Sequence, residues 1–379
     1  KHPTNYLYLI SNPSLLYNKL LRNFEITGLP IRMRAGPTHF FIEVSSHCNL
    51  KCIICERGLA SDINNRGRNM PSELFNTVLP DLRFAHRINF FASGEPFLNP
   101  NLTEFISRIP DHRIFKSIFT NGVSPNIRDC VSEIFKAGIR EIAFSIDAAT
   151  PETYRKIRVG GEFSKVWETL QTVVVKRENF RSPEGVHYPQ ININFVLMKS
   201  NLHELPQLIS KLAKFNIDYF RVMHLDIINE SLESESVGSY ESEVKKILEQ
   251  CIELCDESGI KLCLPLNNPL LIDESLHAME YSELARIPYK GFCFEPWRSL
   301  IIKSDGSVPI CCYNDEPIGN VNNSSIKQIW NTEKMQRLRT LLKSGNQPVR
   351  CKHCPRFAES SVPYYKYKNL PYDLVDSGY

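Results

Sequence analysis

Three cysteines, Cys48, Cys52 and Cys55, lie within one stretch of eight residues, spaced C-x3-C-x2-C. An extended chain covers about 3.3–3.6 Å per residue, so the three thiols can converge on one small inorganic group. Thiolates are soft ligands that suit zinc and iron–sulfur clusters. A structural zinc site normally has four protein ligands, so His47 or a distant cysteine would have to complete it. Three thiols favour an iron–sulfur cluster with one iron open to a non-protein ligand.

The composition is that of an ordinary globular protein. Of 379 residues, 42% are apolar and 23% charged, which is enough for a full-sized core. The net charge of +3 comes from scattered Lys and Arg and predicts no nucleic-acid surface. No apolar run approaches the roughly 18–20 residues of a membrane helix, and no secretory signal is visible. Twelve cysteines without such a signal predict a reducing compartment, the cytoplasm.

A regular alternation of strands and helices begins at residue 38. Six runs rich in Ile, Val and Phe are predicted as strands: Thr38–Val44, Arg87–Ala92, Phe115–Phe119, Glu141–Ile146, Gln190–Leu197 and Tyr219–His224. Helical stretches follow them: 71–83, 101–108, 127–137, 162–178, 203–214 and 240–258. Successive βα units predict an α/β fold with a parallel sheet and helices outside it. Because a closed barrel has eight strands, we expect a partial (β/α)6 barrel.

The chain is expected to divide into five parts. These are a helical arm that packs on the main domain (1–36), the barrel (37–265), a linker (266–290), a small auxiliary domain (291–358) and a tail rich in tyrosine (359–379).

Polar signatures recur at the ends of the predicted strands, where the cysteine loop also lies. Ser93-Gly94-Glu95-Pro96 follows the second strand and Thr120-Asn121-Gly122 the third. Ser145 and Asp147 end the fourth, and Arg158 comes shortly after. Taken singly, these residues could be turn glycines and helix caps. Because they recur at the end of the sheet where reactive loops of such folds lie, they favour one shared site.

The three-cysteine loop, Gly94-Glu95-Pro96 and the strand with Ser145 and Asp147 together resemble the radical S-adenosylmethionine (SAM) superfamily over residues 38–265. The resemblance implies a [4Fe–4S] cluster on the three cysteines, with SAM on its open iron. A reducing partner such as flavodoxin or ferredoxin would supply one electron. SAM would then be cleaved to a 5′-deoxyadenosyl radical that abstracts a hydrogen atom from the substrate.

The resemblance also implies which residues contact SAM. The segment Ser93–Pro96 should hold the SAM amino group, largely through backbone carbonyls, although Ser93 stands where the family usually has a glycine. Ser145 and Asp147 should face the ribose or the carboxylate. Arg158 could pair with the SAM carboxylate, or it could form an ordinary surface salt bridge. Two residues on or just after the fifth strand could approach the ribose or adenine: Asn194 and Met198.

Four further cysteines form a second set: Cys293, Cys311, Cys351 and Cys354. Asp305-Gly306 predicts a hairpin of Ser299–Lys303 with Ser307–Cys311, and a helix is expected around 324–343. Four cysteines are also a common zinc set. The pattern resembles the auxiliary-cluster extension called SPASM, or its short form twitch. This implies one [4Fe–4S] cluster held entirely by protein, which would pass an electron, with Cys312 as a spare ligand or a packed thiol.

The reaction has three interpretations. The one-cluster extension is similar to that of the aminocyclitol dehydrogenase of butirosin biosynthesis, which implies oxidation of an alcohol carbon in a small sugar-like or aminocyclitol metabolite. Epimerisation would need a thiol that donates a hydrogen atom, and Cys263 and Cys312 are the candidates. A peptide- or protein-modifying maturase is the third, although we expect 36 residues before the barrel to be too few for a leader-binding domain. A plain electron carrier would leave the SAM-like strand ends unexplained.

Overall fold

The computed structural model describes residues 13–59, 67–109, 114–180, 188–264 and 293–354. Its main sheet contains β1 (His39–Ile42), β2 (Arg87–Phe90), β3 (Phe115–Thr120), β4 (Glu141–Ser145), β5 (Gln190–Leu197), β6 (Tyr219–His224), β7 (Lys261–Cys263) and β8 (Ser299–Ile302). The spatial order is β7-β6-β5-β4-β3-β2-β1-β8, and every neighbouring pair is parallel. The predicted α/β fold is confirmed, with two strands beyond the six expected.

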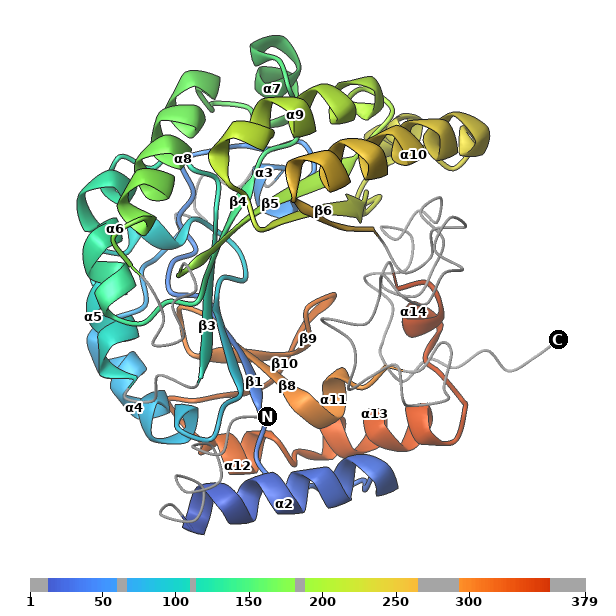
Figure 1. Ribbon diagram of the computed structural model, residues 1–379. Helices are drawn as coiled ribbons and strands as arrows, with labels where there is room; N and C mark the ends of the chain where they lie inside the picture. The colour runs from blue at the N-terminus through green and yellow to red at the C-terminus, as the bar shows by residue number, and fades with distance from the viewer. Residues whose placement is uncertain (1–12, 60–66, 110–113, 181–187, 265–292, 355–379) are drawn as a thin grey trace, which may run out of the picture.

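Helices cover the outside of this sheet (Figure 1). They are α4 (Ser72–Leu82), α5 (Leu102–Arg108), α6 (Asn126–Lys136), α7 (Pro151–Ile157), α8 (Phe163–Arg177), α9 (Leu205–Leu212) and α10 (Glu241–Ser258). The short α3 (Glu56–Leu59) does not belong to this layer and directly follows Cys55. Local chemistry sets their ends. Helix α7 begins with the side chain of Thr150 accepting from the Thr153 amide, and α10 ends at Gly259 in the left-handed conformation.

The two faces of the sheet differ in polarity because side chains alternate along each strand. The outward residues Ile118, Ile142 and Ile193 are fully buried among the apolar core residues. The alternate residues include a buried polar network around Glu141. Its carboxylate accepts hydrogen bonds from Arg87 at 2.7 Å, Arg221 at 2.6 Å and Asn192 at 2.8 Å. The barrel therefore has an apolar outer layer and a partly polar interior.

The C-terminal region contains a hairpin, but its strands differ from those predicted. The Asp305-Gly306 turn is present, with Gly306 at φ +83°. The strand before it, β8, joins the main sheet beside β1, whereas β9 (Ser307–Cys311) pairs in antiparallel fashion with β10 (Asn314–Asn320). The predicted pairing was wrong, since β8 instead forms a parallel ladder of four residues with β1.

Short helices complete this region. They are α11 (Glu295–Arg298), α12 (Ile326–Ile329), α13 (Glu333–Lys343) and α14 (Val349–Lys352), so the helix expected around 324–343 is broken in two. The break follows Trp330.

The N-terminal arm contains α2 (Pro13–Gly28), which lies alongside α12 and α13 (Figure 1). The segment after it is held to the C-terminal region, since Arg339 donates to the Ile31 carbonyl at 3.1 Å and Trp297 to the Pro30 carbonyl at 3.0 Å. Residues 1–12, the predicted linker 266–290 and the tail 359–379 lie outside the described residues. In the described part of the chain, no helix combines the length and apolarity needed to cross a membrane.

Candidate active site at the cysteine loop

The cysteine loop leaves the end of β1 and is held by backbone hydrogen bonds to the segment after α7. Lys51 donates its amide to the Val159 carbonyl at 2.8 Å, and Ile53 to the Ile157 carbonyl at 3.0 Å. Gly58 is required where the chain returns, because a Cβ there would lie 2.2 Å from the Cys52 carbonyl oxygen. These contacts determine the directions in which the three thiols point.

The loop after β2 presses against the segment that leads into the cysteines. Gly94 has φ +81°, and a Cβ on it would lie 2.4 Å from the Ser45 carbonyl oxygen. The Glu95 amide donates to the His47 carbonyl at 2.7 Å. A glycine is needed at position 94 both for the backbone conformation and for this close approach. The sequence-predicted neighbours of the cysteines are therefore in direct contact with their loop.

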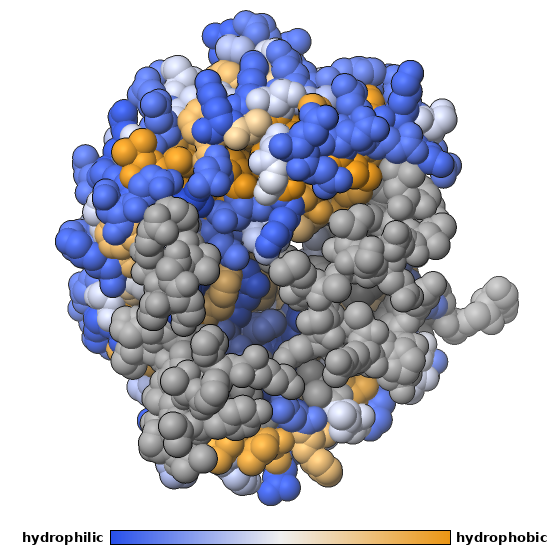
Figure 2. Space-filling view, in the orientation of Figure 1, coloured by the Kyte–Doolittle hydropathy of each residue, from blue (hydrophilic) through white to orange (hydrophobic). Residues whose placement is uncertain are grey.

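A cavity of about 230 Å³ opens over these segments. Seen in the orientation of Figure 1, the space-filling surface is hollowed near its centre (Figure 2). The cavity lining includes Cys48, Cys52, Cys55, Gly94, Glu95, Ser145 and Arg158 among the predicted site residues. It also includes Phe91 and Phe119, whose rings stack at 4.1 Å. Five predicted residues are not part of the lining: Ser93, Pro96, Asp147, Asn194 and Met198.

Arg158 and Asp147 form a buried ion pair rather than a surface salt bridge. Two guanidinium nitrogens of Arg158 lie 2.6 and 2.5 Å from the Asp147 Oδ2 atom, and its Nη1 lies 3.8 Å from the Cys52 sulfur. Burial is the largest single influence and would lower the pKa of Arg158, but Asp147, Cys52 and Tyr154 together outweigh it and raise this pKa. Asp147 also accepts from the Val196 amide at 2.8 Å. Its carboxylate thus holds Arg158 in place beside Cys52.

The Glu95 side chain joins the ends of β2 and β3. Its carboxylate accepts from the Thr120 hydroxyl and the Asn121 amide, each at 2.8 Å. Burial raises the pKa of Glu95 to about 7, against the effect of these hydrogen bonds. Asn121 in turn has its Nδ2 atom 3.8 Å from the Cys48 sulfur. The carboxylate therefore has a role within the fold, and a contact between this segment and SAM would fall to its backbone.

Asn194 lies on β5 next to Ser145 on β4. It is 2% exposed, and within the described part of the chain its Oδ1 atom has no hydrogen-bond partner. A buried oxygen without a partner is unfavourable, and a hydroxyl of a bound ligand would satisfy it. Met198 instead belongs to an apolar cluster with Leu225 and Ile227, against which Ile53 of the cysteine loop packs.

Whether the thiols are protonated determines which metal centre the loop can bind. Burial raises the pKa of Cys52 to about 11 and also raises the pKa of Cys48. A metal centre would supply the positive charge that favours their thiolate forms. In the described ranges, no three His, Cys, Asp or Glu side chains are grouped as they would be around a single metal ion. Three soft sulfur ligands beside an open cavity fit an iron–sulfur cluster with an additional ligand.

The second cysteine set comes from three separate segments. Cys293 precedes α11, Cys311 ends β9, and Cys351 and Cys354 lie in and after α14. Burial raises the pKa of Cys311, and so does the proximity of the Cys354, Cys293 and Cys351 thiols. The structure thus brings the four predicted cysteines together. Cys312 is exposed, and Cys263 lies on β7 beside Arg221; neither belongs to the cavity lining.

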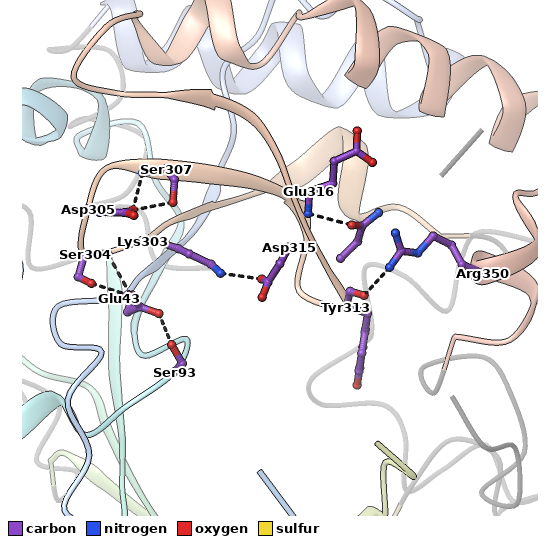
Figure 3. A network of polar contacts seen from close by, with 11 residues as sticks. Glu43, Ser93, Lys303, Ser304, Asp305, Ser307, Tyr313, Asp315, Glu316 and Arg350 are labelled. Atoms are coloured by element: carbon purple, nitrogen blue, oxygen red, sulfur yellow. Dashed lines mark hydrogen bonds and ion pairs between the residues drawn. The ribbon is translucent and has the colours of Figure 1, made fainter. Parts of the chain in front are cut away.

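Asp226 and Tyr313 form a contact between the two regions that sequence reasoning missed. Asp226 follows β6, and its Oδ2 atom accepts a hydrogen bond from the Tyr313 hydroxyl at 3.2 Å. The Tyr313 carbonyl also accepts from Arg350, at 3.5 Å (Figure 3). Burial raises the pKa of Asp226 to about 6; the Tyr313 bond lowers it and nearby Glu56 raises it. Since Glu56 follows Cys55 and Tyr313 comes two residues after Cys311, this carboxylate lies near a sequence neighbour of each cysteine set.

Comparison with family models decides the family. A model described as "Radical SAM superfamily" matches residues 42–212, and the SPASM model, described as "Iron-sulfur cluster-binding domain", matches residues 293–355. The chain belongs to the radical SAM superfamily and carries a SPASM domain. The predicted family and cofactors are therefore confirmed: this radical SAM enzyme uses SAM and iron–sulfur clusters.

Several known proteins are similar to this radical SAM enzyme. A "Tungsten-containing aldehyde ferredoxin oxidoreductase cofactor-modifying protein" of Pyrococcus furiosus is 23% identical, covering 83% of this chain and 86% of its own. An "AdoMet-dependent heme synthase" of Methanosarcina barkeri is 26% identical, covering 82% and 86%. The crystal structure of Streptococcus suis SuiB bound to S-adenosylmethionine has a TM-score of 0.63 at 15% identity, covering 90% of this chain and 77% of SuiB. The last likeness bears on the fold alone.

Proposed function

We propose that this enzyme oxidises a hydroxyl-bearing carbon in a small sugar-like or aminocyclitol molecule. In this proposal Cys48, Cys52 and Cys55 hold the SAM-binding [4Fe–4S] cluster, and a flavodoxin or ferredoxin reduces it. When bound, the cluster and SAM supply the 5′-deoxyadenosyl radical that removes a hydrogen atom from the substrate. The cysteines Cys293, Cys311, Cys351 and Cys354 hold an auxiliary cluster, which supplies a one-electron acceptor when bound.

The protein's own residues orient SAM. Arg158 is held by Asp147 and directs a guanidinium nitrogen toward Cys52, so it offers a fixed cation for the SAM carboxylate. The stacked rings of Phe91 and Phe119 line the cavity and would help to exclude water from the reacting atoms.

The observation that carries the proposal is the Asp226–Tyr313 pair. A carbon that has lost its hydrogen atom becomes a ketone when its hydroxyl loses a proton and one electron leaves. Asp226 is a suitable proton acceptor at its Oδ atoms, because its pKa of about 6 leaves it largely ionised near neutral pH and close to the operating range. Its contact with Tyr313 joins the segment after β6 to a residue two positions beyond Cys311, and we infer that the substrate lies beside this contact.

Epimerisation and peptide modification have weaker support. A radical epimerase would need a thiol that faces the substrate, yet Cys312 is exposed and Cys263 lies on β7 beside Arg221. The two curated relatives described above have names that point to cofactor chemistry, "cofactor-modifying protein" and "heme synthase". These names favour a small molecule over a peptide as substrate.

The test uses aminocyclitols and sugars that carry deuterium at single carbinol carbons. Reconstituted, reduced enzyme should transfer that deuterium to 5′-deoxyadenosine and give a ketone. An epimerase would return an isomer of the substrate that contains solvent hydrogen, and a panel with no ketone at any position would contradict the substrate class. Asp226→Asn should suppress the ketone and spare 5′-deoxyadenosine formation, whereas Asp256→Asn, at an exposed position on α10, should change neither.

A further inference from the structure

Glu43 is a buried carboxylate at the end of β1, with 3% of its surface exposed. Its Oε2 atom accepts a hydrogen bond from the Ser93 hydroxyl. Its Oε1 atom accepts from the Ser304 amide at 3.1 Å and the Ser304 hydroxyl at 2.8 Å (Figure 3). Burying a carboxylate is unfavourable unless it is well hydrogen-bonded, and bonds to an ionised acceptor are stronger than neutral ones. Glu43 is therefore a strong connection between the two serines.

The two serines belong to different parts of the active site. Ser93 begins the loop proposed to hold SAM, and Ser304 lies in the turn between β8 and β9, which leads to Cys311. The Ser304 hydroxyl also lies 3.2 Å from the Ser46 hydroxyl, two residues before Cys48. One carboxylate thus joins the SAM loop, the base of the cysteine loop and the auxiliary domain.

The hydroxyl at position 93 is required for this connection. A glycine there would leave the Glu43 Oε2 atom without its hydroxyl donor. The backbone next to Ser93 is fixed, because Gly94 has a positive φ and packs closely against the Ser45 carbonyl.

We propose that Glu43 is a positioning residue that sets the SAM loop relative to the auxiliary domain through Ser93 and Ser304. The inference rests on the proposed assignment of Ser93–Pro96 to SAM, and it is independent of the proposed substrate. Removing the hydrogen bond of one serine to Glu43 should then weaken the hydrogen bonding of the other serine. A change in the auxiliary turn should alter SAM binding, although Ser304 does not line the SAM cavity.

Hydrogen exchange tests the connection without turnover. In the reconstituted protein, Ser93→Gly should speed exchange of the Ser304 amide by about fivefold, because a loosened Glu43 is a poorer acceptor. Ser93→Thr keeps the hydroxyl and should retain wild-type exchange. Ser307→Ala is the matched control in the same turn, since the Ser307 hydroxyl donates to Asp305 and not to Glu43.

SAM kinetics tests the function. In SAM cleavage without substrate, Ser304→Ala and Ser93→Gly should each raise the KM for SAM by about 3–10-fold, the effect of one hydrogen bond, with kcat and iron content unchanged. The double variant should show less than the product of the two effects, because both act through Glu43.

Two results would overturn the proposal. One is a wild-type KM for SAM in Ser304→Ala. The other is wild-type exchange at the Ser304 amide in Ser93→Gly. An unchanged KM together with faster exchange is a case of the first result, in which the connection is structural alone. Neither experiment contains the molecule that the enzyme is proposed to oxidise, so an error in the proposed substrate class would leave these results unaffected.

Discussion

The two cysteine sets are built in opposite ways. The first takes three thiols from one short loop, whose shape is determined by nearby backbone bonds and by glycines at positions 58 and 94. The second takes four thiols from three segments between Cys293 and Cys354, brought together by β9, α11 and α14. The first set opens on a cavity lined by strand ends, whereas the second offers a complete protein ligand set. This difference predicts separate tasks, radical generation at one set and electron acceptance at the other.

The largest effect should come from the first set. Cys48→Ala removes one of three ligands from a site that has no spare, so SAM cleavage should fall to background. Iron should fall from about eight atoms per chain toward about four, the content of the auxiliary cluster. Chromatographic detection of 5′-deoxyadenosine and an iron assay measure both. Cys130→Ala, on α6, is the matched control and should behave as wild type. Full cleavage by Cys48→Ala would refute the ligand assignment.

The second set should separate cleavage from oxidation. Cys351→Ala should abolish ketone formation, because the electron has no acceptor, while a measurable rate of SAM cleavage remains. The readout is the ratio of ketone to 5′-deoxyadenosine, which should approach zero. If the ratio stays at its wild-type value, the auxiliary cluster does not accept the substrate electron. A chain holding one cluster and one zinc ion would contradict the auxiliary cluster itself.

The same contrast explains what the sequence could predict. The first cysteine set and the polar strand ends could be predicted from the sequence, because local spacing and strand alternation determine where those residues lie. The strand β7 was missed because three residues carry too little pattern, and β8 was misassigned because its partner, β1, is more than 250 residues away. Three further residues were missed for the same reason: Glu43, Asp226 and Tyr313. The proposed role of each depends on a hydrogen bond to a residue that is distant in the sequence.

The role proposed for Asp226 predicts how the ratio of ketone to 5′-deoxyadenosine depends on pH. The pKa of Asp226 is raised to about 6, so the carboxylate gains its proton, and loses its capacity as an acceptor, as the pH falls through that value. The ratio of ketone to 5′-deoxyadenosine should therefore rise with pH and level off above about 6. Taking the ratio cancels effects on SAM cleavage, including any from Glu95, whose pKa is raised to about 7. Asp226→Asn should lower the ratio about 100-fold and abolish this pH dependence.

The smallest effect should be confined to the first set, where Asp147 holds Arg158 beside Cys52. Removing one member of a buried ion pair leaves a buried charge without compensation and typically costs about 3–5 kcal/mol. Asp147→Asn keeps the shape and the acceptor for the Val196 amide, so the loss of unfolding free energy should fall at or below that range. The KM for SAM should rise about tenfold, because Arg158 is no longer held toward its ligand. Denaturant unfolding and SAM titration measure the two effects.

The exposed pair Arg128–Glu168 provides the matched control, since its side chains are 43% and 57% exposed. Glu168→Gln should change the unfolding free energy by less than about 1 kcal/mol and leave the KM for SAM as it is. The ketone to 5′-deoxyadenosine ratio should stay at its wild-type value in both variants, because neither change touches Asp226 or the second set. A fall in that ratio with Asp147→Asn would mean that the two cysteine sets are not separable in function, and the assignment of separate tasks would fail.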